Sequence, residues 1–409
     1  MKKWVISDAI VITSDGVVES GSVSVANGKV AQISTDDISG AIRIDVQGAV
    51  LSPGLINAHD HLLGTYYPKV GNGPYENWLP WDNDLKSSPI YRERQQIENA
   101  DLYLLGGYRN LLSGVTTVSD HIPHFVGDPY YDTLPMKAVR EFTMAHSIAS
   151  FALAWGGEIH TEYQAAVDKK IPFVTHISEG FDAETVQDVK VLNRQGGLGE
   201  YSVLIHGIAF SKSDMELISE KGASTVWCPD SNMYMFNETT DIKMQIESGI
   251  NVTLGTDSPM SGGLNLLTEM KFAKKLYKSM YGEELSDEMI FKMVSSNSAK
   301  AFHNSLIGSI KEGNTADFTL VRDRGGSPHN SIVDARMRDI LLVVVDGLPA
   351  YGDLEFAHVF ESLGVDYQEI VVDGVDKVVT GDLIGLLKRI SRAVGFKKEF
   401  PFLPVDFDF

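Results

Sequence analysis

The stretch Pro53-Gly-Leu-Ile-Asn-Ala-His-Asp-His61 decides which fold we expect of this chain. An apolar run typical of a strand ends here in two histidines, His59 and His61, spaced two residues apart. Side chains at that spacing on a strand point to the same face. Two imidazoles that project together are poor core residues but good ligands for one divalent metal. A metal site at a strand end is therefore the first hypothesis.

Three later segments repeat this arrangement, each with a polar side chain at the end of an apolar run. They are Val174-Thr-His176, Leu204-Ile-His206 and Leu254-Gly-Thr-Asp257. From Val50 onward, predicted strands alternate with predicted helices, which indicates a parallel sheet. An open sheet and a closed barrel both fit this alternation. The polar strand ends favour the barrel, because there the carboxyl ends of the strands converge on one point.

One unit of this barrel is expected to be abbreviated. The predicted strands cover residues 114–119, 147–154, 172–175, 202–205, 224–227 and 251–254. The predicted helices cover residues 88–112, a segment beginning near Ser213, 264–281 and 286–303. The interval from His121 to His176 spans only 55 positions (176 − 121). It should hold the third and fourth strands, although a βα unit normally needs roughly 25 or more residues.

Both ends of the chain predict short strands joined by turns. Asp15-Gly16 and Asn27-Gly28 are hairpin signals between alternating apolar runs. The simplest account is one small β-domain built from residues 1–50 and 309–409, with a barrel of residues 51–308 inserted between them.

The carboxyl-terminal part is expected to form a helix near residues 381–395, followed by a tail. The tail from Phe396 to Phe409 contains five phenylalanines. We expect it to cover apolar surface of its own chain, with docking on a neighbouring subunit as the alternative.

Composition narrows the class of partner. The formal net charge is -20, with 55 acidic against 35 basic residues, which argues against nucleic acid or an anionic membrane. It favours a neutral or cationic small molecule. No run approaches 18 apolar residues, so we expect no transmembrane helix, and the start does not read as a signal peptide. The single cysteine, Cys228, fits a reducing cytosol, and we expect a cytoplasmic location.

Several motifs, taken in order along the chain, resemble the amidohydrolase superfamily, and more narrowly its cytosine/guanine deaminase and triazine-hydrolase branch. They are the stretch of residues 53–61, Gly114-Val-Thr-Thr-Val118, His176-Ile-Ser-Glu179, His206-Gly207, Cys228-Pro-Asp-Ser-Asn232, Gly255-Thr-Asp-Ser258 and Gly308-Ser-Ile-Lys-Glu-Gly-Asn-Thr-Ala-Asp317. The resemblance runs over most of the chain. It implies a distorted (β/α)8 barrel of the TIM type plus a split β-sandwich, in agreement with the organisation above.

The resemblance implies that His59, His61, His176 and Asp257 bind one divalent metal ion. Zinc is favoured, and iron and manganese are compatible with three nitrogens and one oxygen. Such an ion lowers the pKa of a bound water, and Asp257 would accept the proton that this water releases. His206 would hydrogen-bond the water or the forming oxyanion. Hydrogen-bonded core histidines and an Asx turn at Asp257 are the plain structural alternatives.

Two further observations concern the reaction. Glu179 would protonate a ring nitrogen and relay a proton to the departing amine, with its pKa raised by burial or tuned by the metal site. A surface glutamate that opens the next helix is the alternative. Relatives with two metal ions usually bridge them with a carboxylated lysine at the end of the fourth strand. Residues 147–154 contain no lysine, so one ion is expected.

Substrate contacts are expected from three places. The segment Glu76-Asn-Trp-Leu-Pro-Trp81 resembles the family's loop over the substrate, and Trp78 and Trp81 would stack on a planar heterocycle or simply pack. His121 lies at the second strand end, where local hydrogen bonding would explain it equally well. Ser231 and Asn232 follow the seventh strand, where turn propensity alone would explain them.

The resulting expectation is a metal-dependent aminohydrolase that deaminates a planar nitrogen heterocycle, a hydrolase of carbon-nitrogen bonds other than peptide bonds. One alternative is a hydrolytic dechlorinase or N-dealkylase of a triazine-like ring, or a cyclic amide hydrolase. Another is a catalytically silent barrel that serves as an assembly partner. An open-sheet nucleotide-binding protein would need Gly-x-Gly-x-x-Gly after the first strand, which is absent. The family and the aromatic tail suggest a homodimer.

Overall fold

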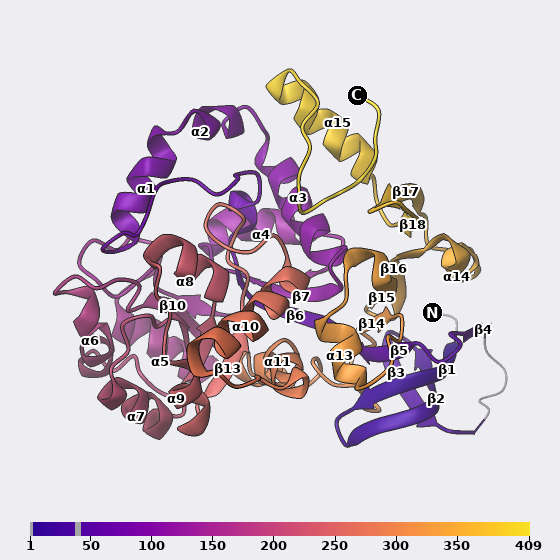
Figure 1. The fold of residues 1–409 in the computed structure, drawn as a ribbon, viewed down its shortest axis with the longest axis horizontal. Helices are drawn as coiled ribbons and strands as arrows, with labels where there is room; N and C mark the ends of the chain where they lie inside the picture. The colour runs from indigo at the N-terminus through magenta and orange to yellow at the C-terminus, as the bar shows by residue number, and fades with distance from the viewer. Residues whose placement is uncertain (1–2, 37–41) are drawn as a thin grey trace.

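The computed structural model describes residues 3–36 and 42–409. The chain divides visibly into a region of short strands and helices and a β-rich region (Figure 1). In the β-rich region the N-terminal strands, in indigo, lie beside C-terminal strands, in orange, so the two ends of the chain build it together.

Eight parallel strands build the barrel, in one hydrogen-bonded group of three and one of five. They are β6 (Leu55–Asp60), β7 (Val115–Asp120), β8 (Lys137–Ala138), β9 (Thr143–Met144), β10 (Phe173–Ile177), β11 (Ser202–His206), β12 (Ser224–Trp227) and β13 (Asn251–Leu254). The chain closes next to β6, where the backbone amide of Asp257 donates to the carbonyl of His59 at 3.0 Å. The predicted α/β barrel is confirmed.

Helices alternate with these strands. They are α3 (Asn99–Leu111), α4 (His124–Tyr131), α5 (Ile159–Lys169), α6 (Asp188–Arg194), α7 (Lys212–Lys221), α8 (Pro229–Phe236), α9 (Ile242–Glu247), α10 (Leu266–Tyr281), α11 (Asp287–Met293) and α12 (Ser296–Ala301). Every residue of β6, β7, β10 and β11 is buried. Strands covered on both faces must satisfy any polar side chain internally, so the histidines that end them need partners inside the protein.

Two predicted helices are each divided in the structure. Residues 88–112 form α2 (Pro89–Arg94) and α3, because residues 95–98 leave the helical path. This break lets α2, together with α1 (Trp78–Ser87), extend away from the barrel as an insert (Figure 1). Residues 286–303 form α11 and α12, with the break at Val294 and Ser295.

The short interval between His121 and His176 contains two abbreviated strands. The prediction of a strand over residues 147–154 is wrong, since those residues are irregular and the fourth strand is β9. Their apolar side chains serve another purpose, with Ile148 and Ala149 buried where the segment crosses the barrel end. Residues 139–142 join β8 to β9 without a helix, so the abbreviated unit is located here.

The β-rich region is one mixed sheet of ten strands, in the order β17-β18-β16-β15-β14-β5-β1-β2-β3, with β4 paired to β1. The strands are β1 (Trp4–Thr13), β2 (Gly16–Ala26), β3 (Lys29–Ser34), β4 (Ile42–Asp45), β5 (Val50–Pro53), β14 (Phe318–Val321), β15 (Ile340–Val345), β16 (Leu348–Asp353), β17 (Gln368–Val372) and β18 (Val375–Val379). Alternate residues such as Trp4, Ile6, Phe318 and Leu342 share one apolar core. The division into domains at residues 50 and 308 stays a prediction, and β5 crosses the first boundary.

The remaining helices are α13 (Pro328–Val333), α14 (Ala357–Leu363) and α15 (Leu383–Val394). The tail after α15 packs on its own chain, as expected. The ring of Phe400 lies 5.8 Å from that of Tyr66, and a β-bridge joins Val405 to Val372. None of the helices within residues 3–36 and 42–409 has the length and apolar character that a membrane span requires.

Candidate metal centre and active site

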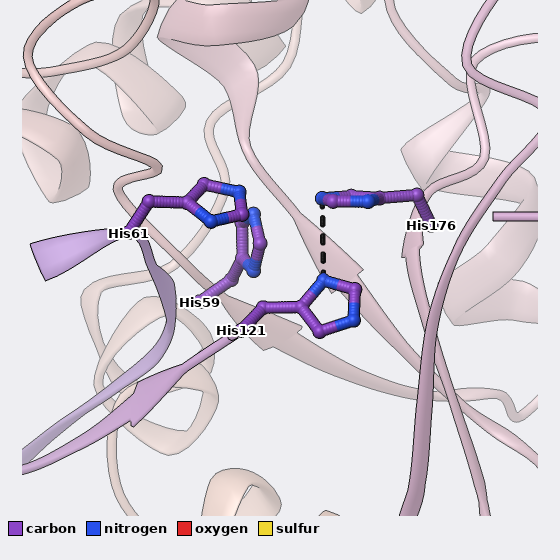
Figure 2. A group of neighbouring side chains, drawn as sticks. All are labelled: His59, His61, His121 and His176. Atoms are coloured by element: carbon purple, nitrogen blue, oxygen red, sulfur yellow. Dashed lines mark hydrogen bonds between the residues drawn. The ribbon is translucent and has the colours of Figure 1, made fainter. Parts of the chain in front are cut away.

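Four imidazole rings converge at the carboxyl ends of three barrel strands (Figure 2). His59 and His61 come from the end of β6, His121 directly follows β7, and His176 lies on β10. One ring nitrogen from each lies within 4.8 Å of the others. His59, His121 and His176 are buried, and His61 is partly exposed. Such a concentration of nitrogen ligands is the chemistry of a transition-metal site.

Asp257 adds a carboxylate to this cluster. Its Oδ1 lies 3.8 Å from Nε2 of His59 and 3.9 Å from Nε2 of His61. Its Oδ2 accepts hydrogen bonds from the hydroxyls of Ser231 at 2.8 Å and Ser261 at 2.7 Å. The backbone of Asp257 is left-handed, with a φ of 53°, a conformation that persists only where the surroundings hold it. The serines fix the carboxylate so that it faces the histidines.

His206 and Glu179 lie beside the cluster. Nε2 of His206 is 3.6 Å from Oε1 of Glu179. Nδ1 of His206 donates to Oδ1 of Asn232 at 2.9 Å, and Nδ2 of Asn232 donates to Thr239 at 3.1 Å. This chain of hydrogen bonds places the proton of His206 on Nδ1. Its Nε2 is therefore an acceptor that faces Glu179.

The pKa values of the two acids in the site are shifted in opposite directions. Burial raises the pKa of Glu179 well above its ordinary value, and the carboxyl groups of Asp257 and Asp188 add to this rise. Burial alone would also raise the pKa of Asp257, but His61 and His206 bring it below its ordinary value. Two carboxyl groups with separated pKa values are suited to different roles, one as a proton donor and one as an anion.

A cavity of about 370 Å³ opens above these residues. Its lining is mainly apolar and aromatic and includes Leu63, Tyr67, Trp78, Trp81, Leu85, Tyr91, Ile122, His146, Trp155, Met235 and Met260, with His61, His176, Glu179, His206 and Asp257 among the polar residues. The insert that carries Trp78 and Trp81 is tied to the strand end by a β-bridge between Asn77 and Gly180. The volume and character are those of a site for a small planar molecule.

Comparison with known proteins identifies the family. Residues 157–349 match the model of the Amidohydrolase family. A 5-methylthioadenosine/S-adenosylhomocysteine deaminase of Pyrococcus furiosus is 28% identical over 419 aligned positions, which cover 87% of this chain and 95% of that protein. The chain is similar to the amidohydrolase family. The predicted family and enzyme class, a hydrolase, are confirmed.

Solved structures confirm the fold of this chain. A triazine hydrolase from Arthrobacter aurescens superposes with a TM-score of 0.73 at 19% identity, over 86% of this chain and 95% of that one. An adenosine deaminase from Xanthomonas campestris with bound zinc superposes with a TM-score of 0.70 at 19% identity, over 88% and 96%. At these identities the likeness concerns the barrel and the strands that both chain ends add to it.

The residues of this site fit a divalent metal ion. Within residues 3–36 and 42–409, both ring nitrogens of His59 are buried without a hydrogen-bond partner. An orphaned buried imidazole is costly, and an ion ligated by one of its nitrogens would remove much of that cost. The predicted ligands His59, His61, His176 and Asp257 all reach this centre from three separate segments, in two overlapping groups that share His59.

The residues predicted to contact the substrate occupy three different positions in the site. Trp78 and Trp81 line the cavity. Ser231 and Asn232 are fully buried and hydrogen-bonded to Asp257 and His206, which is a supporting position. His121 lies within the histidine cluster. Contact of these residues with a substrate stays a prediction.

One residue of the site has no role in the sequence-based prediction. His146 lines the cavity, with its ring 4.7 Å from that of Trp78 and 4.6 Å from that of Trp155. Burial lowers the pKa of His146 to about 3, so the ring is neutral. The signal was present in Phe142-Thr-Met-Ala-His146, a short apolar run that ends in histidine like those before His176 and His206.

Proposed function

We propose that this amidohydrolase removes an amino group from a purine-type ring by hydrolysis, with an adenosine-like nucleoside as the substrate class and one divalent ion as cofactor. Zinc is the favoured ion. The observation that carries the proposal is the position of Glu179. A buried carboxylic acid stands beside the histidine cluster at the base of an aromatic-lined cavity.

The burial and hydrogen bonds of three side chains suggest the role of each in proton transfer. A bound divalent ion would supply an activated water. Glu179, whose pKa burial raises, would give a proton to a ring nitrogen and later carry a proton to the leaving amine. Asp257, which stays ionised, would accept a proton, and His206 would offer its bare Nε2 to the reacting centre. One imidazole and two carboxyl groups thus have separate tasks.

The nucleoside class is supported by the relatives and by the cavity. The Pyrococcus furiosus relative described above is named for adenosine derivatives. Trp78, Trp81 and Trp155 offer flat faces to a ring, while Asp82 and Arg94 also line the cavity and would suit the hydroxyls of a sugar. A nucleoside deaminase needs both an aromatic surface for the base and polar side chains for the sugar.

Ammonia release from the metal-loaded enzyme tests the proposal. The panel contains adenosine, 5'-deoxyadenosine, 5'-methylthioadenosine, S-adenosylhomocysteine, guanine and cytosine, together with a chlorinated triazine for which chloride is measured. We expect ammonia from at least one adenosine derivative. Chloride release or ring opening without ammonia would support the triazine or cyclic-amide alternative and overturn the proposal. No turnover of any compound by protein that binds zinc would favour the silent barrel.

We also propose a cytoplasmic homodimer. A single cysteine is typical of reducing compartments, and Phe396 and Phe409 remain exposed at the ends of the tail. Light scattering of the purified protein measures the mass, which should be twice that of one chain. A mass of one chain at micromolar concentration would contradict the dimer.

A further inference from the structure

His121 is fully enclosed at the carboxyl end of β7, and both of its ring nitrogens face atoms of other residues. It is 1% exposed, and its ring centroid lies 4.4 Å from that of His176 (Figure 2). The neighbouring residue, Ile122, lines the substrate cavity. The position of His121 is therefore that of a residue inside the metal centre.

The hydrogen bonds fix the proton of His121. Its Nε2 lies 3.1 Å from the carbonyl oxygen of Ala145. A carbonyl oxygen only accepts, so Nε2 carries the hydrogen, and in the neutral ring Nδ1 is a bare acceptor. The same ring has no second N–H with which to bind a substrate. In this orientation His121 is therefore poorly suited to the substrate contact that the sequence predicted.

The proton of His176 is fixed in the same way. Its Nδ1 lies 2.7 Å from the carbonyl oxygen of His146, so Nδ1 donates and Nε2 is bare. Nδ1 of His121 and Nε2 of His176 are 3.4 Å apart. Two bare lone pairs therefore face each other in a buried place with no hydrogen between them, which is unfavourable unless a cation lies within reach of both.

The separation of these nitrogens matches a shared ion. Two nitrogens that each lie about 2.0–2.1 Å from one ion are roughly 2.9–3.6 Å apart at ligand angles of about 90–120°. A direct N–H···N hydrogen bond would normally bring the nitrogens closer, to about 3.2 Å or less. His59 and His61 complete the group, with all four ligand atoms within 4.8 Å of one another.

We propose that His121 is a further ligand of the metal ion, through Nδ1, in addition to His59, His61 and His176. This inference rests on the metal-dependent function proposed above and adds a nitrogen to the ligand set expected from the sequence. The four imidazoles come from the ends of β6, β7 and β10, so the ion ties three strands of the barrel together.

Two substitutions separate a ligand from a structural residue. Asn at position 121 can place its oxygen near the position of Nδ1, whereas Gln places its amide nitrogen near that of Nε2. His121→Gln therefore retains the hydrogen bond to Ala145 and loses the ligand, and His121→Asn does the reverse. His124→Gln is the matched control, because Nε2 of His124 also donates to a backbone carbonyl, that of Phe142, at 2.9 Å.

Zinc affinity, measured by competition with a chelator, and the absorption spectrum of the cobalt-substituted protein are the readouts. We expect His121→Gln to lower zinc affinity about 100-fold or more and to change the cobalt spectrum. His121→Asn should lose less affinity, and His124→Gln should match the wild type. Circular dichroism of the metal-free proteins checks that each variant is folded.

Each result has a defined consequence. Wild-type affinity and an unchanged cobalt spectrum in His121→Gln would overturn the inference, while the proposed function would stand if His61→Ala loses zinc. A fall in affinity without a change in the cobalt spectrum would also overturn it, since His121 would then act only from outside the coordination sphere. A wild-type protein that binds neither zinc nor cobalt would overturn the proposed function and this inference together.

Discussion

Arg109 and Asp60 form an ion pair that is buried directly behind the two histidines of β6. Nη1 of Arg109 lies 2.8 and 2.7 Å from the two carboxylate oxygens, and the residues are 1% and 0% exposed. Nη2 of Arg109 donates to the backbone carbonyls of Asp257 at 3.0 Å and Gly263 at 2.7 Å. One side chain thus connects the strand that carries His59 and His61 to the loop that carries Asp257.

Removal of Arg109 should destabilise the protein strongly. Arg109→Met leaves the carboxylate of Asp60 buried without its partner, and we expect a loss of about 3–5 kcal/mol in the free energy of unfolding. Urea unfolding measures this loss. The double variant Asp60→Asn with Arg109→Met should recover part of it, because no unpaired charge remains in the core.

A surface ion pair provides the control. Arg389 donates to Asp101 at 2.9 Å, but its side chain is 42% exposed. Arg389→Met should therefore cost less than about 1 kcal/mol. If Arg109→Met were as mild as Arg389→Met, the ion pair behind the histidines would not hold the site in place.

Stability should also depend on the titration of Asp188, which accepts a hydrogen bond from the amide of Ser178 at 2.8 Å. Burial raises the pKa of Asp188 to about 7 from an ordinary value of 3.8. The folded protein then holds a proton that the unfolded chain has released, so this contribution is full below about pH 4 and is lost as the pH rises to about 7.

Asp188→Asn removes that titration. The stability of the variant relative to the wild type should therefore rise by about 2–4 kcal/mol between about pH 4 and about pH 8. Urea unfolding at several pH values across this range measures it. Stability curves that run parallel for the two proteins would show that Asp188 is ionised in the folded state throughout.

The strand-end pattern was sufficient to predict most of the side chains that meet in the candidate metal centre. His59, His61, His176 and Asp257 each end a buried apolar run, and a parallel barrel brings such ends together regardless of how far apart they are in sequence. The parallel strands β10 to β13 were long enough to be predicted, since three to five consecutive buried residues form a clear pattern.

The third and fourth strands could not be found in this way. β8 and β9 have two residues each, and they are strands only because β7 and β10 lie beside them. The apolar run of residues 147–154 is a stronger local pattern, but only residues 147–149 are buried, and they lie at the end of the barrel and not in a sheet. The position of His146 in the cavity likewise depends on tertiary structure, so the local sequence did not predict it.

Glu179 should be required for turnover but not for the metal. Glu179→Gln keeps the size of the side chain and removes the proton donor, so kcat should fall about 100- to 10,000-fold. Zinc content, measured by elemental analysis, should match that of the wild type. Glu184→Gln is the matched control, because Glu184 accepts from the exposed Ser150. A kcat for Glu179→Gln within a few fold of the wild type would assign the proton transfer to another group.

Trp78 should contribute to substrate affinity through its ring and not through its N–H. Its Nε1 is buried without a hydrogen-bond partner, so Trp78→Phe loses no hydrogen bond and should preserve both stability and KM. Trp78→Ala removes the aromatic face and should raise KM about 5- to 150-fold, equivalent to ~1–3 kcal/mol of stacking. Steady-state kinetics on the best substrate of the panel measures both.

Trp4 in the mixed sheet is the control, because its indole N–H does form a hydrogen bond. Nε1 of Trp4 donates to the carbonyl of Gly347 at 3.0 Å, far from the cavity. Trp4→Phe should therefore lower the free energy of unfolding by about 1 kcal/mol and leave KM unchanged. Equal KM values for Trp78→Ala and the wild type would show that the indole of Trp78 only packs the insert. The ring of the substrate would then lie against Trp81 or Trp155, which line the same cavity.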